Sequence, residues 1–275
     1  MSPHPEQWQA RAGRFVEPPH LDHYAERYAD YFAFTRRDGI LEMRMHTGGD
    51  AVRYSLGLHN AWGQAWREIG ADPENEVLII TGTGDHWIHP GDPAGLADMM
   101  RPPRPEHFTH GVIYHDAAKL VENFVFGIDI PTIAAVNGPS PGHTEFALLS
   151  DITLAAETAT FLDPHLLAGT APGDGLQLTL QELLGTKRAA YHLYTGEPID
   201  ARTAEEVGLV NEVLTADRLL PRAWEIATSI RSRPRAARRL THAIVSRPWK
   251  RRLVQDFGYG LAHEMFGISA DRVFG

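Results

Sequence analysis

The chain has 275 residues, of which 43% are hydrophobic and 22% charged, and its formal net charge is -9. This length suits one large domain, or one domain with a small appendage, and the acidic balance disfavours nucleic acid as a partner. Because the chain contains no cysteine, a disulfide framework, a thiol nucleophile and a cysteine-type zinc site are excluded.

The N-terminal residues 1–25 are rich in proline and charged side chains and lack the apolar stretch of a secretory signal. They predict a loose or helical arm on a cytoplasmic protein. No segment of the chain is apolar over the length needed to cross a bilayer, so no membrane association is expected.

The next elements predict a hairpin followed by β-α-β units. Asp38-Gly39 is a strong two-residue turn signal between the apolar runs 32–35 and 40–46. The alternation that follows predicts an α/β fold with mostly parallel strands. In chain order, the further expected elements are a helix over 58–69, a strand over 77–81, a helix over 111–126, a strand over 132–136, a helix over 143–149 and a strand over 152–156.

From Leu176 onward the pattern is almost wholly helical. Apolar residues at helical spacing, including Leu219, Ala223, Leu253 and Phe257, need a surface that a short helical layer lacks alone. We therefore expect this region to pack on a neighbouring subunit. The arginine-rich stretch 231–252 is interleaved with apolar residues, which favours a solvated helix face or a subunit contact over a polyanion site.

Four ordered motifs cover most of the chain. They are 79–84 (IITGTG) with Trp87 and Gly91-Asp92, 131–139 (PTIAAVNGP) with Ser150-Asp151, 160–175 ending in GTAPGDG, and 193–213 with LYTG and GLVNEV. Together they resemble the motifs of the crotonase superfamily, also called enoyl-CoA hydratase/isomerase. The resemblance implies a crotonase-type spiral of β-β-α turns over residues 26–215 and a helical C-terminal trimerisation region over 216–275. It also implies a homotrimer, or a hexamer built from two trimers.

The turns that hold a thioester oxygen in ordinary crotonases are altered here. Pro90 follows His89, the residue expected to donate its backbone N–H, and restricts it to extended geometry. His143 stands in the second turn, where the family keeps glycines that let a thioester approach the backbone. Thioester binding is therefore disfavoured.

The two glutamates used by the family's hydratases are also replaced. Their positions fall on Phe146 and His165, and Glu145, one position from the first, is interpreted as facing solvent or capping a helix. The replacements resemble the 6-oxocamphor hydrolase branch of the superfamily, which cleaves bicyclic β-diketones. By position, the residues matching that branch's active-site histidines and acids are His59, His143, His165, Asp174 and Glu264, and Tyr54 falls where the branch has an aromatic residue that contacts the substrate.

Hydrolysis of a cyclic β-diketone needs a base that activates water and a group that stabilises the departing enolate. A neutral imidazole oriented by a carboxylate suits the first role, which indicates His165 with Asp174. His143 is expected to donate a hydrogen bond to the second carbonyl and then to protonate the enolate. His59, Glu264, Tyr54, Trp87 and His89 are expected to bind substrate or to support these groups, and neither a metal nor a coenzyme is required.

Several alternatives stay open. Trp87, Leu96, Met99 and Met100 could line an apolar substrate pocket or belong to the ordinary core. The protein could instead be an enoyl-CoA hydratase/isomerase or an acyl-CoA thioesterase with His165 as an unusual base, or a non-catalytic scaffold of the same fold. The sequence also leaves open whether Glu264 completes the site of its own subunit or of a neighbour.

Overall fold

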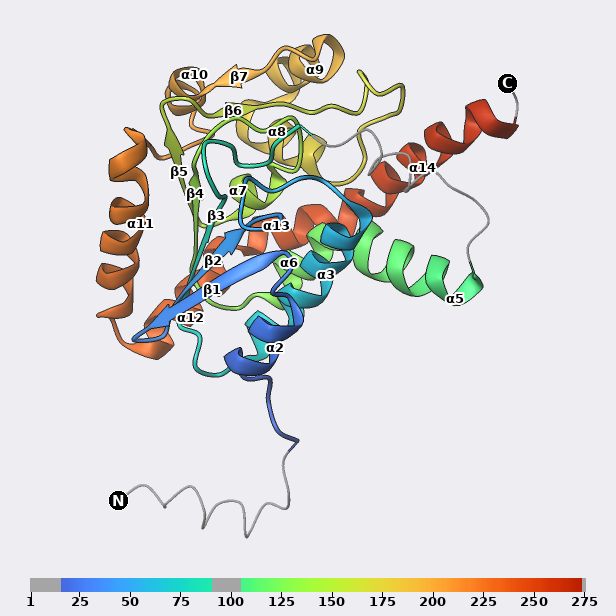
Figure 1. Ribbon diagram of the computed structural model, residues 1–275. Coiled ribbons are helices and arrows are strands. Elements are labelled where there is room, and N and C mark those ends of the chain that lie inside the picture. Colours follow the sequence, from blue (N-terminus) through green and yellow to red (C-terminus); the bar gives the residue numbers. More distant parts are fainter. Residues whose placement is uncertain (1–15, 91–104, 274–275) are drawn as a thin grey trace, which may run out of the picture.

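The computed structural model describes residues 16–90 and 105–273 (Figure 1). Gly91-Asp92 of the first motif, the pocket candidates Leu96, Met99 and Met100, and residues 1–15 of the expected arm lie outside these ranges.

The predicted hairpin is confirmed. Strands β1 (Phe32–Arg37) and β2 (Ile40–Met45) are antiparallel, and Arg37 pairs with Ile40 across a two-residue loop. Asp38 and Gly39 both have positive φ, of 51° and 79°. This conformation suits the right-handed twist of the two strands and favours glycine and aspartate at these positions. The turn therefore sets the register of the first two strands.

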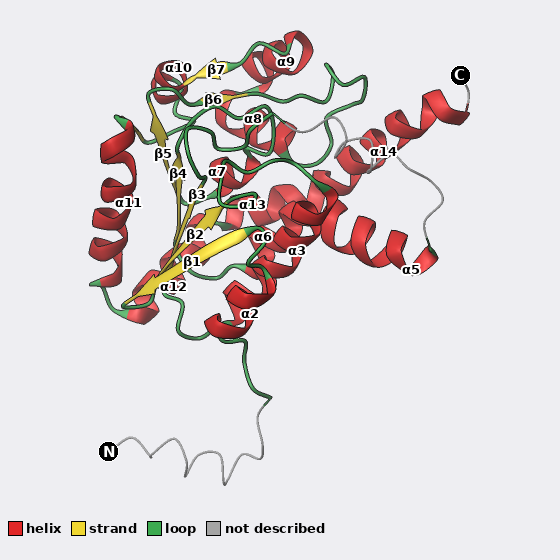
Figure 2. Cartoon of the chain, viewed as in Figure 1, coloured by secondary structure: helices red, strands yellow, loops and turns green. Residues whose placement is uncertain are grey.

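The main sheet has six strands in the order β1-β2-β3-β4-β5-β8, and every pair after the hairpin is parallel (Figure 2). The α/β class and the mostly parallel pairing are thus confirmed. The remaining strands are β3 (Val77–Thr81), β4 (Thr132–Val136), β5 (Ile152–Ala156) and β8 (Glu212–Leu214), and a separate antiparallel pair is formed by β6 (Thr160–Phe161) and β7 (Ile199–Asp200).

Both faces of the central strands are buried, as their nearly continuous apolar runs predict. Along β3, Leu78 and Ile80 point into the main core, while Val77 and Ile79 point into a second core on the opposite face. Helices α3 (Leu56–Ala71), α6 (Leu120–Gly127) and α7 (Glu145–Leu149) contribute to the main core, and α11 (Ala216–Arg231) covers the other face (Figure 1). The strands are therefore held between two helical layers.

The helices have the following bounds. They are α2 (Leu21–Arg27), α3 (Leu56–Ala71), α5 (Glu106–Phe108), the π-helix η1 (Thr109–Ala118), α6 (Leu120–Gly127), α7 (Glu145–Leu149), α8 (Leu176–Leu184), α9 (Thr186–Thr195), α10 (Ala201–Glu206), α11 (Ala216–Arg231), α12 (Arg235–Val245), α13 (Arg247–Arg252), the π-helix η2 (Leu253–Phe257) and α14 (Gly258–Val273).

Three predicted elements need correction. The single helix expected over 111–126 is divided into η1 and α6, and Asp116 of η1 is fixed to α3 by bonds from Asn60, Gln64 and Arg67. The helix expected from 143 begins at Glu145. The region after Leu176 is not almost wholly helical, because it contributes β7 and β8, which are too short to produce an alternating sequence pattern.

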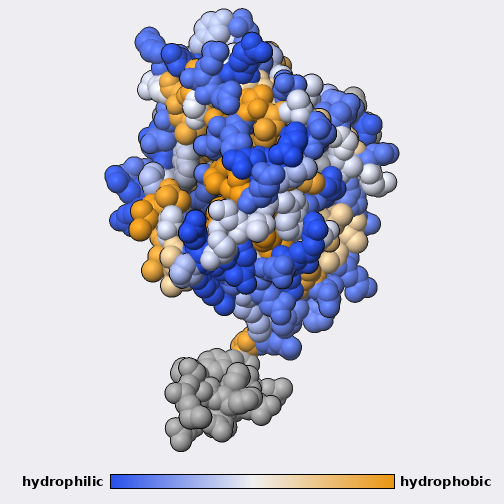
Figure 3. Space-filling view, turned by 90° about the vertical axis from the view of Figure 1, so that its left-hand side faces the viewer, coloured by the Kyte–Doolittle hydropathy of each residue, from blue (hydrophilic) through white to orange (hydrophobic). Residues whose placement is uncertain are grey.

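Four of the C-terminal apolar residues that were expected to need a neighbouring subunit are buried within this chain instead. Leu219 and Ala223 of α11 are buried against the chain's own sheet, and Leu253 and Phe257 lie in its main core. Phe266 on α14 remains 63% exposed. The side of the molecule on which α11 lies is largely hydrophilic, with separate apolar patches (Figure 3). Assembly as a trimer or hexamer therefore remains a prediction.

The arginine-rich stretch is largely paired within the chain. Arg238 is buried and contacts Glu76, and Arg239 bonds to Asp129 at 2.8 Å. Within the described ranges, the structure contains no helix with the length and apolar character of a membrane span. Helix α2 crosses the predicted boundary at residue 25, and its Tyr24 lies fully buried in the main core.

Candidate active site

The candidate residues converge from distant parts of the chain. Tyr54, Trp87 and His143 lie in loops that follow β2, β3 and β4, respectively. The carboxyl ends of parallel strands meet at one edge of a sheet, where α/β proteins commonly bind ligands. Asn137 joins two of these loops, since its Nδ2 donates to the carbonyl oxygens of Gly84 and His86 at 2.9 and 2.8 Å.

His165 lies in the loop after β6 and is held by a carboxylate. Its Nδ1 is 2.8 Å from Asp163 Oδ1, which also accepts the backbone N–H of His165 at 3.0 Å. Its Nε2 lies 3.5 Å from Asp174 Oδ2 and 3.7 Å from Glu264 Oε1. The expected proximity of His165 and Asp174 is therefore present, but Asp163 makes the bond that orients the ring.

Asp174 and Glu264 meet because a glycine lets their backbones approach. A Cβ on Gly173 would lie 2.2 Å from the carbonyl oxygen of Gly260 and 2.7 Å from the Cβ of Glu264. Glycine at this position thus brings the turn before α8 against α14. Glu264 consequently reaches the His165 of its own chain, and the carboxylate of Asp174 also accepts the backbone N–H of Leu176 at 3.3 Å.

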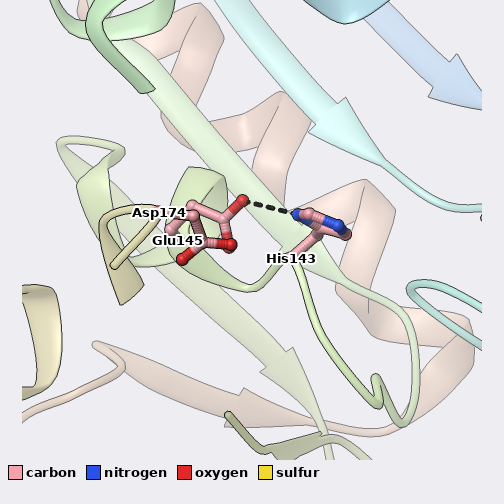
Figure 4. A group of neighbouring side chains, drawn as sticks. All are labelled: His143, Glu145 and Asp174. Atoms are coloured by element: carbon pink, nitrogen blue, oxygen red, sulfur yellow. Dashed lines mark hydrogen bonds and ion pairs between the residues drawn. The ribbon is translucent and has the colours of Figure 1, made fainter. Parts of the chain in front are cut away.

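His143 forms the second half of the site. Its Nδ1 lies 2.9 Å from Glu145 Oε1, and its Nε2 lies 2.9 Å from Nε2 of His59 on α3. Figure 4 shows Glu145 and Asp174 together on the Nδ1 side of the ring. The interpretation of Glu145 as solvent-facing is wrong, because this residue is 1% exposed and its carboxylate faces inward to His143.

Aromatic residues hold His143 from its other sides. Tyr54 stacks on the imidazole with ring centroids 5.0 Å apart, and the Nε1 of Trp87 donates to the carbonyl oxygen of His143 at 3.0 Å. His143 has a φ of 53°, a left-handed conformation that favours glycine and costs a non-glycine residue on the order of 1–3 kcal/mol. His143 thus has a backbone conformation typical of glycine and adds an imidazole to it.

The turn at His89, where the resemblance places the first thioester-binding donor, has an internal hydrogen bond. The backbone N–H of His89 donates to the carbonyl oxygen of Val52 at 2.8 Å, so an internal partner occupies this donor. The His89 side chain contacts Arg53 at 3.3 Å. His89 therefore stands apart from the hydrogen-bonded groups around His143 and His165.

The charged groups shift one another's pKa values. Burial by itself lowers the pKa of His165, but the charge of Asp174 and the charge and hydrogen bond of Asp163 outweigh it and raise this pKa to about 10. Burial, with the charge of Asp174, raises the pKa of Glu264 to about 7. The neighbouring carboxylates therefore favour the imidazolium of His165 over the neutral imidazole expected from the sequence.

The two other histidines are shifted in opposite directions. Burial, aided by the positive charges of His143 and His165, holds the pKa of His59 well below its usual value. Burial also opposes the charged form of His143, but Glu145 and Asp174 raise its pKa overall. The short contact between the two rings is thus best described as His143 donating from Nε2 to a neutral His59.

Two sets of side chains have the spacing of metal ligands. In each set, one candidate ligand atom per residue lies within 4.8 Å of the others, and Asp174 belongs to both. Histidine nitrogen with carboxylate oxygen suits zinc and other transition metals. The sets are His143, Glu145 and Asp174, and His165, Asp174 and Glu264.

Sequence reasoning missed Asp163 and Glu145. Each lies two residues from a candidate histidine, Asp163 before His165 and Glu145 after His143. A carboxylate two positions from each histidine was the available signal. It is weak, because such spacing in a loop does not fix which way the side chains turn.

Comparison with known proteins gives the family and several relatives. The family model described as enoyl-CoA hydratase/isomerase matches residues 35–266. A crotonyl-CoA hydratase of Syntrophomonas wolfei is 36% identical over 64% of this chain and 65% of its own length. A probable enoyl-CoA hydratase of Mycobacterium leprae is 32% identical over 83% of this chain and 84% of its own.

One similar solved structure differs from these relatives in its described activity. It is a β-diketone hydrolase of the cyanobacterium Anabaena sp. PCC 7120 bound to (S)-3-oxocyclohexyl acetic acid, and it is 35% identical with a TM-score of 0.83. The match covers 94% of this chain and all of that one. The fold predicted from the four motifs, an α/β crotonase fold with a helical C-terminal region, is thereby confirmed.

Proposed function

The chain belongs to the enoyl-CoA hydratase/isomerase family, the crotonase superfamily, and we propose that within it this protein hydrolyses a carbon–carbon bond of a cyclic β-diketone. The observation that carries the proposal is His143, whose imidazole occupies a glycine-like backbone position and is held by Glu145 and His59. A side chain at this position obstructs a thioester but offers a donor to a ketone.

The hydratase glutamate positions support the same choice. Phe146 is fully buried and packs against Trp62 and Trp66, so this position contributes to the apolar core. The second position carries His165 between Asp163, Asp174 and Glu264. The two positions therefore lack the glutamates that would add water to an enoyl thioester. They do provide a group, His165, that can help to activate water for attack on a ketone.

In the proposed reaction, His165, Asp174 and Glu264 activate water as one unit, since groups this close share protons. Glu264 accepts the water proton, because its pKa of about 7 suits a base near neutral pH. The His165 imidazolium stabilises the forming hydroxide and the tetrahedral oxyanion. The hydroxide oxygen forms a bond to the first carbonyl carbon.

Collapse of this intermediate restores the first carbonyl and breaks the bond to the central carbon. The electron pair moves to the second carbonyl, which becomes an enolate. The enolate oxygen accepts the hydrogen bond that His143 Nε2–H donates to His59 in the free protein. His143 then gives this proton to the enolate carbon, and Glu264 returns a proton to solvent. The products are a carboxylic acid and a ketone within one molecule, and no coenzyme takes part.

The test compares two substrate classes on the purified protein. We expect turnover of a bicyclic 1,3-diketone to a keto acid, and no hydration or hydrolysis of crotonyl-CoA at enzymatic rates. The diketone should also raise the melting temperature while coenzyme A leaves it unchanged, because only bound species stabilise the fold. Crotonyl-CoA turnover comparable with that of a hydratase would overturn the proposal, and neither binding nor turnover would favour a scaffold.

The acidic limb of the pH profile gives a separate prediction. The carboxylate form of Glu264 predominates above its pKa of about 7. We therefore expect kcat/KM to decline as the pH falls through about 7, because protonated Glu264 cannot accept a proton from water. Glu264→Gln should lower the rate and remove this limb, whereas the exposed control Glu157→Gln should retain it. A Glu264→Gln profile superimposable on that of the wild type would exclude Glu264 as the acceptor.

A further inference from the structure

We propose that Glu145 is the positioning residue for His143, the carboxylate that fixes which ring nitrogen faces the substrate. The inference rests on the proposed function for its catalytic meaning, but its structural part concerns the free protein. The residue is unlike the glutamates of the family's hydratases, since it acts through a histidine and not on the substrate.

The tautomer follows from the two bonds of the ring. An ionised carboxylate can only accept, so with Glu145 ionised the proton between His143 Nδ1 and Glu145 Oε1, which are 2.9 Å apart, belongs to the imidazole. Nε2 is then the nitrogen that faces His59, at 2.9 Å. Glu145 thus leaves Nε2 as the position from which His143 donates and later loses a proton.

The geometry is fixed by more than one contact. Glu145 is the first residue of α7 and is 1% exposed, so its carboxylate is held within the protein. Trp87 holds the backbone carbonyl of His143, and Tyr54 stacks on the ring within 10° of parallel. The imidazole can therefore neither turn over nor slide away from the carboxylate without breaking these contacts.

The ionised form of Glu145 depends on His143, because burial raises the pKa of Glu145 while the charge and hydrogen bond of His143 lower it. The second carboxylate oxygen of Glu145, Oε2, is buried and has no hydrogen-bond partner among the described residues. A buried carboxylate that lacks full hydrogen bonding is stabilised chiefly by a nearby positive charge. Asp174 lies beside it (Figure 4), so two carboxylates favour the imidazolium of His143.

Other titratable groups surround this pair. The positive charge of His165 and the cost of burial oppose the His143 imidazolium, while Glu145 and Asp174 favour it. The groups that face the pair are Tyr54 before α3, His59 on α3, His165 after β6, Asp174 before α8 and Glu264 on α14. Loss of the Glu145 charge should therefore leave His143 more readily deprotonated.

The proton-transfer step is balanced by this arrangement. The Nε2–H bond of His143 breaks as a C–H bond forms at the enolate carbon, whose electron pair makes the new bond. His143 is left neutral with its Nδ1–H still donated to Glu145. A proton from solvent restores the imidazolium before the next turnover, and no oxidant or reductant is involved.

The test begins with the wild-type protein in the absence of substrate. Nitrogen-15 NMR of the His143 ring, assigned by the disappearance of its signals in His143→Ala, should show a protonated Nδ1 throughout the titration. In Glu145→Gln, whose amide oxygen can still accept from Nδ1, the His143 pKa should fall because the charge is lost. Glu42→Gln, which alters a buried carboxylate bonded to Trp224 outside the site, is the matched control.

Kinetics then separate positioning from a general structural role. As the pH rises, the rate on a bicyclic diketone should begin to fall at a lower pH in Glu145→Gln than in the wild type. In this variant kcat should also be reduced at least about tenfold, with little change in KM. Glu145→Asp keeps the negative charge, so it should recover part of the activity that Glu145→Gln loses at high pH.

The outcomes distinguish this inference from the proposed function. An unprotonated Nδ1 in wild-type His143, or an unchanged His143 titration in Glu145→Gln, would overturn the positioning role whatever the enzyme turns over. The expected NMR result without diketone turnover would instead retain Glu145 as the partner of His143 and reject the reaction. The wild-type measurement keeps the inference testable even if Glu145→Gln does not fold.

Discussion

His143→Ala should lose about 10²–10³ in kcat on a bicyclic β-diketone, which corresponds to ~2.7–4 kcal/mol of transition-state stabilisation. Charge develops on the second carbonyl only as the carbon–carbon bond breaks, so the hydrogen bond from His143 Nε2 strengthens in the transition state. Ground-state binding should largely survive, and KM should change less than kcat. Steady-state kinetics of the variant beside wild type give both quantities.

Stereochemistry provides a second measurement on the same variant. If His143 delivers the proton, it does so to one face of the enolate, and without it solvent protonates either face. The product of a prochiral diketone should therefore lose enantiomeric purity, as measured by chiral chromatography. His23→Ala, at an exposed histidine of α2, is the matched control. Near-normal kcat with unchanged enantiomeric excess would make His143 a bystander and point to His59 or a backbone donor.

Asp174→Asn should lower kcat by a factor on the order of 10³ or more while the protein stays folded. The asparagine carbonyl oxygen can still accept the backbone N–H of Leu176, which Asp174 accepts at 3.3 Å. The variant loses the negative charge of Asp174, which lies close to both His143 and His165. This charge favours the imidazolium of His165. Water activation and proton delivery should therefore both weaken.

The charge effect of Asp174 can be measured directly. Because Asp174 helps to raise the pKa of His165 to about 10, the His165 titration should move to lower pH in Asp174→Asn. Asp217→Asn, at an exposed site in the first turn of α11, controls for loss of an acidic group. Rates within about threefold of wild type, a barrier change of under ~1 kcal/mol, would remove Asp174 from the mechanism.

Much of the fold follows from local sequence pattern. The buried runs of β3, β4 and β5 have the predicted bounds, because continuous β-branched and apolar residues between turn signals are typical of parallel strands covered on both faces. The shorter β7 and β8 depend on pairing with distant strands. Their own residues carry too little pattern to distinguish them from loops.

Residues of the candidate site could be predicted where they differ from the residue that the family pattern leads one to expect. They could not be predicted where the role depends on the direction in which the side chain points. His143 and His165 stand out as departures from a family pattern, and the structure brings them close to Asp174 and Glu264. Asp163 and Glu145 lie in loops beside them, and only the tertiary arrangement turns their carboxylates toward the rings. Similarly, the burial of Leu253 and Phe257 within the chain depends on where the helices pack.

The position of Glu264 on α14 has a consequence for how activity arises during synthesis. The strands of the main sheet and the loops that bear His143, His165 and Asp174 all precede α14 along the chain. A nascent chain emerging from the ribosome can therefore assemble this framework before Glu264 is available. Under the proposed function, the site is therefore complete only after α14 docks against Gly173, so activity would be acquired late in synthesis.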